Sequence, residues 1–302
     1  MESLSSAIAK RVSLGSAEII GLRQSKTLAA RFSCSFFNQK VSFCRTCSAD
    51  KLALRNTWNS INHFQSSSSP SHFEGPQLED DMVKELRRKK LGIFVSGGGS
   101  NFRAIYDATI NELIHGDVSV LVTDKASCGG AEYARDKGIP VLLFPKSKSC
   151  PEGLSSMDLI NALRAFEVDF LLLAGYLKLI PIELVQAYPK SILNIHPSLL
   201  PAFGGKGFYG MKVHKGVIAS GARYSGPTVH FVDEHYDTGL ILAQKVVPVL
   251  ANDTPEQLAA RVLQEEHKVY VEAVAALCDD RIVWRVDGVP LIRSKENPDE
   301  YS

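Results

Sequence analysis

The stretch LGIFVSGGGSNFRAIYDATI, residues 91–110, contains the pattern that decides the fold. Its first five residues form a short apolar run of the kind found in buried parallel strands. The segment SGGGSN over 96–101 interrupts that run, and apolar residues then recur at helical spacing over 102–110. A buried strand that leads through a glycine loop into a helix predicts an α/β domain.

The same alternation of strand and helix continues along the chain. We expect strands over 118–123, 141–144, 170–174 and 192–195, and helices over 130–136, 157–166 and 181–187. Such alternation predicts a doubly wound, mostly parallel sheet.

After residue 201 the pattern changes. We expect, in order, a glycine-rich loop over 203–210, a helix over 213–219, β-rich runs over 228–232 and 240–249, a long helix over 255–277, and a hairpin over 281–292 that turns at Asp287 and Gly288. The polar tail over 295–302 is expected to be frayed.

The N-terminal segment differs in composition from the rest of the chain. It is rich in serine, and up to Phe73 it holds 9 Lys and Arg residues against 3 Asp and Glu. This composition is typical of an organellar transit peptide, and the abundance of serine favours plastid over mitochondrion. A disordered extension without a targeting role is the alternative. We therefore predict a leader over 1–75, a linker over 76–88 and a folded domain over 89–294.

Charge and cysteine content exclude several classes of function. Beyond Phe73 the chain has 25 basic and 30 acidic residues, which leaves no basic face for nucleic acid. No run approaches the roughly 20 apolar residues of a membrane-spanning helix. Cys44 and Cys47 form a C-x-x-C pair, but no second pair completes a metal site, so we expect no metal.

The glycine loop is the first candidate for ligand binding. Glycines let a ligand approach the backbone, and the first N–H groups of the following helix point at an anion. The spacing matches neither G-x-G-x-x-G nor a P-loop. We expect Gly99, Ser100 and Asn101 to hold the phosphate of a small molecule; the alternative is a tight turn in which Ser100 or Asn101 only caps the helix.

The segment SILNIHPSLLP, residues 191–201, is the second candidate. Asn194 and His196 are two apart on a strand, so their side chains leave the same face, and Pro197 keeps His196 extended. An amide and an imidazole side by side suit acyl chemistry, because both can stabilise an oxyanion and the imidazole can move a proton. A buried histidine with only a structural role is the alternative.

Six short motifs occur along residues 91–292 in one order: VSGGGSN, LLAGYL, NIHPSLLP, GPTVHFV, DTG and QEEH. This ordered set resembles the folate-dependent formyltransferases and, within them, the branch that acts on glycinamide ribonucleotide. The resemblance implies a Rossmann-like N-terminal half. It also implies formyl transfer from 10-formyltetrahydrofolate, a reduced folate, to the amine of glycinamide ribonucleotide in purine synthesis. Both ligands are small molecules, and the expected assembly is a monomer or homodimer.

The resemblance also assigns residues. It adds Asp237 to Asn194 and His196 as a catalytic residue, and a nearby carboxylate is expected to raise the pKa of His196. It places Glu266 against the ribosyl group of the substrate. It assigns folate binding to Asn194 together with Leu177, Lys178, Leu179 and Ile180. Lys178 stands where many bacterial members have arginine, which removes the planar stacking that arginine offers.

Three other functions remain open at this level. A formyltetrahydrofolate deformylase would use a similar Asn, His and Asp set with water as nucleophile. A non-catalytic folate or nucleotide sensor would keep the fold and binding alone. A transfer-RNA formyltransferase is disfavoured by the acidic body of the chain.

Overall fold

The computed structural model describes residues 87–148 and 150–302. The expected leader over 1–75 lies outside the described residues, as does most of the linker over 76–88.

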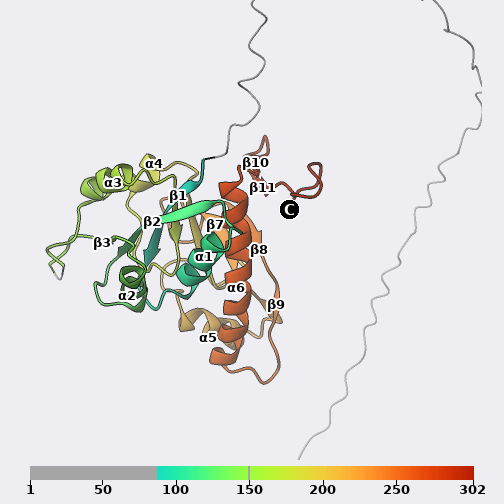
Figure 1. Cartoon of the computed structure of the whole chain (residues 1–302). Helices are drawn as coiled ribbons and strands as arrows, with labels where there is room; N and C mark the ends of the chain where they lie inside the picture. The colour runs from blue at the N-terminus through green and yellow to red at the C-terminus, as the bar shows by residue number, and fades with distance from the viewer. Residues whose placement is uncertain (1–86, 149) are drawn as a thin grey trace, which may run out of the picture. The chain divides into compact units, whose positions relative to one another are not determined.

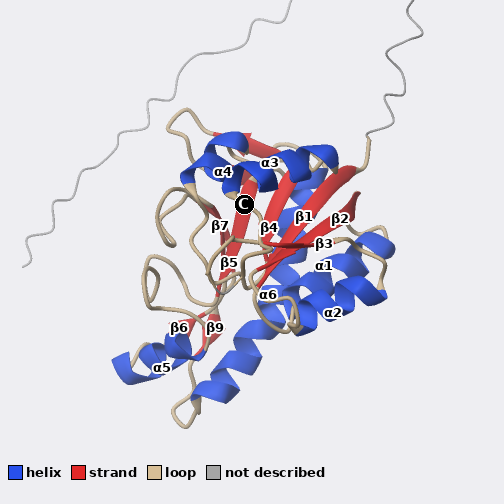
Figure 2. Ribbon diagram, turned by 90° about the vertical axis from the view of Figure 1, so that its left-hand side faces the viewer, coloured by secondary structure: helices blue, strands red, loops and turns tan. Residues whose placement is uncertain are grey.

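A seven-stranded sheet forms the centre of the domain, in the order β3-β2-β1-β4-β5-β7-β8 (Figure 2). The first five strands of this order are parallel; β7 runs antiparallel to β5, and β8 runs antiparallel to β7. The strands are β1 (Lys89–Val95), β2 (Gly116–Thr123), β3 (Val141–Leu143), β4 (Phe170–Leu173), β5 (Ile192–His196), β7 (Thr228–Phe231) and β8 (Ile241–Gln244). The predicted α/β fold is confirmed, and the order 3-2-1-4-5 is that of a Rossmann-like half.

Helices cover both faces of this sheet (Figure 1). One face packs on α1 (Ser100–Ile110), α2 (Gly129–Asp136) and α6 (Pro255–Cys278), and the other on α3 (Ser156–Ala165) and α4 (Ile182–Ala187). Alternation along β1 explains the two cores, since Ile93 and Val95 belong to the first and Phe94 to the second. A third, smaller core joins α5 (Met211–Ser220) to the first half of α6.

Local chemistry explains where α6 begins and how it reaches the sheet. Thr254 and Gln257 form a reciprocal capping box, and Pro255 occupies the first turn. Two turns before the end of the helix, the buried hydroxyl of Tyr270 donates to the carbonyls of Leu173 on β4 and Leu193 on β5, at 3.2 and 3.1 Å. These contacts fix α6 against the two strands that end at the candidate site.

Two parts of the C-terminal half differ from the expectation. The run over 240–249 is split into β8 and β9 (Val247–Pro248), and β9 pairs with β6 (Tyr224–Ser225), which the periodicity did not indicate because it is only two residues long. The expected hairpin is present as β10 (Ile282–Trp284) and β11 (Pro290–Ile292). The expectation of a frayed tail is wrong, because Tyr301 forms a bridge with Arg293 and Ser302 exchanges two backbone hydrogen bonds with Ile292.

Candidate functional site

A cavity of about 750 Å³ opens at the carboxyl ends of β4 and β5. The loop after β4 and the end of β5 form one wall, the loop over 205–212 and Asp237 form a second, and α6 forms a third. Carboxyl ends of parallel strands are where ligands collect in open α/β sheets. Most of the residues predicted for catalysis and substrate binding line this one cavity.

The glycine loop is shaped by its contact with α2. Gly99 has φ +73°, and a Cβ there would lie 2.9 Å from the Cα of Gly130. The N–H of Gly130 also donates to the carbonyl of Gly97 at 3.0 Å. Only glycine at position 99 therefore lets the two helices start this close together.

This loop leaves free N–H groups at the start of α1. The first intrahelical bond runs from the N–H of Arg103 to the carbonyl of Gly99, so the N–H groups of Ser100, Asn101 and Phe102 precede it. Of the predicted phosphate ligands, the side chain of Asn101 lines the cavity, whereas Gly99 and Ser100 do not.

The side chains of Asn101 and Glu266 form a buried pair. The Asn101 amide donates to the Glu266 carboxylate at 2.7 Å, and both residues line the cavity. Burial raises the pKa of Glu266, and this hydrogen bond opposes the rise. The amide oxygen of the same side chain, Asn101 Oδ1, is buried without a hydrogen-bond partner. Two residues that the sequence placed on different parts of the substrate thus form one polar group.

The three residues predicted for catalysis lie together at the carboxyl end of β5: Asn194, His196 and Asp237. The Nδ1 atom of His196 is 3.4 Å from Oδ2 of Asp237, and the Asn194 amide is 3.5 Å from Oδ1. All three residues line the cavity. The structure therefore brings together the three side chains that the sequence assigned to catalysis.

The loop over 203–210 holds Asp237 in place. The N–H of Gly205 donates to its carboxylate at 2.9 Å. A Cβ on Gly204 would lie 2.4 Å from the Leu200 side chain and 3.2 Å from Cβ of Asp237. Asp237 itself has φ +57°, a conformation that costs free energy for a residue other than glycine and persists where surrounding contacts impose it.

The electrostatics of His196 differ from the expectation. Burial lowers the pKa of His196, and this effect exceeds the opposing effects of Asp237 and of the Phe203 carbonyl. The prediction that Asp237 raises the pKa of His196 identified a real contribution, but the net direction is wrong. The pKa of Asp237 is lowered: burial alone would raise it, and the hydrogen bonds and the neighbouring histidines together outweigh burial.

Both ring nitrogens of His196 face acceptors. Nε2 lies 2.9 Å from the carbonyl of Phe203, and Nδ1 faces Asp237. A neutral imidazole has one N–H and can satisfy one of these acceptors, whereas an imidazolium satisfies both. Burial and hydrogen bonding thus act in opposite directions on the protonation of this ring.

His230 is part of the site and was not among the predicted site residues. Its Nδ1 faces the carbonyl of Phe231 at 2.8 Å, so this nitrogen carries the hydrogen. Its Nε2 then accepts from the Asn194 amide at 3.0 Å and lies 3.7 Å from Asp237. The sequence alone does not indicate this role, because it depends on the antiparallel register in which β7 pairs His230 directly with Asn194.

The predicted folate residues divide into two groups. The side chains of Leu177 and Leu179 are about half exposed, and Leu177 lines the cavity. The N–H of Leu177 donates to the hydroxyl of Ser96 at 3.0 Å, which links this loop to the glycine loop. Ile180 is 3% exposed and packs in the second core, so only its backbone is available to a ligand.

Lys178 lies beside a buried carboxylate. Its ammonium group is 3.9 Å from Oδ2 of Asp124, and the other oxygen of Asp124 is buried without a partner. A positive charge at position 178 therefore lies next to a buried acid.

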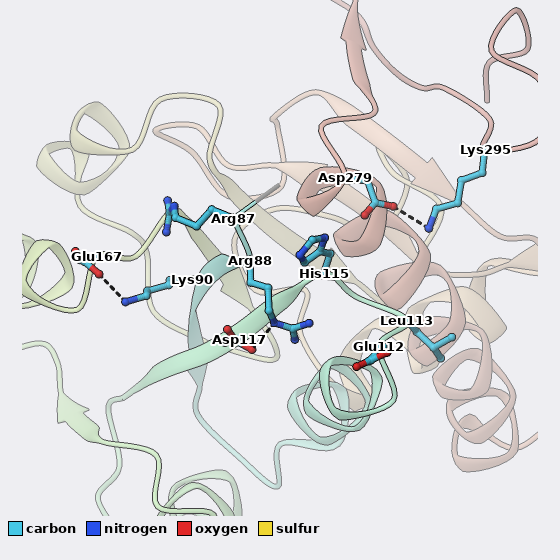
Figure 3. A pocket seen from close by; sticks show the side chains of 10 residues that line it. All are labelled: Arg87, Arg88, Lys90, Glu112, Leu113, His115, Asp117, Glu167, Asp279 and Lys295. Atoms are coloured by element: carbon cyan, nitrogen blue, oxygen red, sulfur yellow. Dashed lines mark hydrogen bonds and ion pairs between the residues drawn. The ribbon is translucent and has the colours of Figure 1, made fainter. Parts of the chain in front are cut away.

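A larger hollow of about 970 Å³ lies at the amino ends of β1 and β2, away from this site (Figure 3). Its cations face acids: Arg88 pairs with Asp117, Lys90 with Glu167, and Lys295 with Asp279.

No group of three His, Cys, Asp or Glu residues that could hold a metal is found in the described part of the chain. Among the described helices, none is long and apolar enough to cross a membrane.

Comparison with known proteins agrees with this geometry. The formyl transferase family model matches residues 89–274. A chloroplastic phosphoribosylglycinamide formyltransferase of Vigna unguiculata is 69% identical over 78% of this chain and 76% of its own length. The phosphoribosylglycinamide formyltransferase of Bacillus subtilis is 39% identical over 63% of this chain and 94% of its own. The crystal structure of the Anaplasma phagocytophilum phosphoribosylglycinamide formyltransferase superposes with a TM-score of 0.62 at 32% identity, covering 71% of this chain and 96% of that one.

Proposed function

Since the chain belongs to the formyl transferase family, we propose that it transfers a formyl group from 10-formyltetrahydrofolate to the amine of glycinamide ribonucleotide. The observation that supports this most directly is the meeting of Asn194, His196 and Asp237 in the cavity that also holds Asn101 and Glu266.

The reaction forms one C–N bond and breaks another. The neutral amine attacks the formyl carbon, and the carbonyl oxygen becomes an oxyanion. One hydrogen of the Asn194 amide is held by His230, and the other makes only a 3.5 Å contact with Asp237. That second hydrogen, whose direction the His230 contact fixes, is available to donate to the oxyanion and stabilise it.

His196 and Asp237 handle the proton in this proposal. The attacking amine loses a proton as the C–N bond forms, and the pair gains a hydrogen bond by accepting it, because a protonated His196 satisfies both Asp237 and Phe203. The proton then passes to the departing folate nitrogen as the old C–N bond breaks. The step as proposed relies on positioning and electrostatics alone.

The two ends of the cavity suit the two substrates. The N–H groups at the start of α1, formed by Gly99, Ser100 and Asn101, receive the phosphate, and Glu266 receives the ribosyl hydroxyls. The folate lies against the loop over 177–180, where Leu177 offers an apolar side chain and Ile180 its backbone. Lys178 and Asp124 pair beside this loop, and neither side chain lines the cavity.

The remaining proposals concern the whole chain. We assign the catalytic domain to residues 89–294 and the Ser-rich segment over 1–75 to plastid import, in line with the chloroplastic names of plant relatives. The assembly proposed is a monomer or homodimer.

Product analysis tests the function. Purified protein with 10-formyltetrahydrofolate and glycinamide ribonucleotide should give formylated product in equal amount to the folate released. The control omits the amine. Substantial loss of formyl groups to water without the amine would instead indicate a deformylase.

A further inference from the structure

The cavity contains an imbalance of charge that the proposed function does not resolve. Two carboxylates line it, Asp237 and Glu266, and both are fixed by hydrogen bonds. A substrate phosphate bound at the start of α1, where Asn101 contacts Glu266, adds further negative charge to this partly buried cavity. Such a ligand needs a cation nearby as well as backbone N–H groups.

The helices that form the nucleotide end supply no cation. The α6 lining consists of Ala259, Ala260, Leu263 and Glu266, and α1 contributes Asn101. Arg103, in the first turn of α1, lies over the ring of Tyr133 at 4.6 Å and does not line the cavity. The ammonium groups among the described lining residues are those of Lys206, in the glycine-rich loop over 203–210, and Lys212, in the first turn of α5.

The two lysines differ in whether their ammonium groups already contact another side chain. Lys212 donates to the hydroxyl of Tyr209 at 3.0 Å and lies over the same ring at 4.4 Å. Lys206 has neither an ion pair nor a hydrogen bond within residues 87–148 and 150–302. Its neighbour Gly205 donates to Asp237, so the base of this lysine is held at the reaction centre while its ammonium group is free.

We propose that Lys206 is the counter-ion of the substrate's phosphate and thereby determines the preference for a phosphorylated amine. This inference rests on the proposed function and specifies which residue makes the substrate class possible. The backbone N–H groups of α1 orient the phosphate, and the lysine offsets the carboxylates of Asp237 and Glu266.

The experiment compares glycinamide ribonucleotide with glycinamide riboside, which lacks only the phosphate. We expect Lys206→Met to lower kcat/KM for the ribonucleotide about tenfold or more, the scale of one charge-assisted hydrogen bond. The value for the riboside and the KM for 10-formyltetrahydrofolate should not change. Lys215→Met, which removes an exposed lysine of α5 outside the cavity lining, is the matched control and should resemble wild type.

Three results would overturn the proposal: an equal loss with both amines, a loss confined to the folate KM, or a phosphate-dependent loss in Lys212→Met with none in Lys206→Met. Isothermal titration of the ribonucleotide into each variant gives the same comparison without turnover. A wild-type protein that makes no product from the ribonucleotide would refute the proposed function instead, so the two failures are distinguishable.

Discussion

The Nδ1 atom of His196 lies 3.4 Å from Oδ2 of Asp237, while Nε2 of the same ring faces the carbonyl of Phe203 at 2.9 Å. A neutral imidazole has one hydrogen too few to donate to both acceptors, and burial lowers the pKa of the ring. The pair is therefore suited to take up a proton only when the reaction releases one. Asp237 favours this uptake, since its negative charge stabilises the protonated form of His196.

The first prediction concerns Asp237→Asn. The amide keeps the size of the side chain and loses its charge, so His196 no longer gains an ionic partner by accepting a proton. We expect kcat to fall by a factor of about 100 or more, the range of general acid–base contributions. The melting temperature should stay close to that of wild type. Glu234→Gln, an exposed acid three residues earlier, is the control, and a similar loss in that variant would contradict the assignment.

The second prediction concerns His230, which holds the Asn194 amide at 3.0 Å. In His230→Leu the amide loses this acceptor and can rotate, so kcat should fall about tenfold while both KM values change little. His230→Gln retains a side-chain acceptor and should recover part of the loss. A KM effect without a kcat effect, or no difference between the two variants, would show that His230 has only a packing role.

Much of the sheet could be predicted from sequence because buried strands and amphipathic helices have different apolar periods. The ends of β4 and β5 could be placed for the same reason, and with them Asn194 and His196. The short strand β6 could not, since two residues show no period. The return of Tyr301 to Arg293 depends on tertiary pairing that local composition does not encode.

The electrostatics of the site were harder to predict than its members. The family resemblance indicates that Asp237 lies near His196, but the pKa of His196 depends on how much water the fold removes from the ring. The same holds for Glu266, whose burial against Asn101 becomes apparent only when α1 and α6 are packed. His230 was missed because its role depends on the register of an antiparallel pair.

The third prediction concerns the glycine loop. In Gly99→Ala a Cβ meets the Gly130 backbone at 2.9 Å in a left-handed conformation, so the free energy of unfolding should fall by about 1–3 kcal/mol. Gly97→Ala is the matched control, because no heavy atom lies within 4 Å of its Cβ and its change should stay within about 0.5 kcal/mol. Urea denaturation measures both. Equal effects in the two variants would show that the contact with α2 does not constrain the loop.

The fourth prediction concerns the dependence of stability on pH. Burial lowers the pKa of His196, His214 and His267 in the folded protein below the ordinary value of 6.5. As the pH falls below about 6.5, the unfolded chain therefore binds protons before the folded one. The unfolding free energy should decrease toward acid, by at most about 1.4 kcal/mol per pH unit for each histidine.

His214→Gln isolates one of these contributions, because other titrating groups, including Glu266, are common to both proteins. Denaturant unfolding at a series of pH values between about 7.5 and 5.5 should give a shallower slope for the variant than for wild type. An unchanged or steeper slope would contradict the proposed effect of burial on His214.

The last prediction separates binding from stability at Glu266. Burial raises the pKa of this carboxyl. At pH values above the ordinary titration range of glutamate, the ionised form of Glu266 therefore destabilises the folded protein. Glu266→Gln removes that cost and keeps an oxygen to accept from Asn101. At pH 8 we expect the unfolding free energy to rise by on the order of 1 kcal/mol, while the KM for glycinamide ribonucleotide rises about tenfold because neutral acceptors bind hydroxyls less strongly.

Glu265→Gln removes the same charge from a surface ion pair with Lys268 and should change stability by less than about 0.5 kcal/mol. A destabilised Glu266→Gln with an unchanged KM would show that the carboxylate serves the fold; the opposite pair of results would show that a buried acid is tolerated here because the substrate needs it.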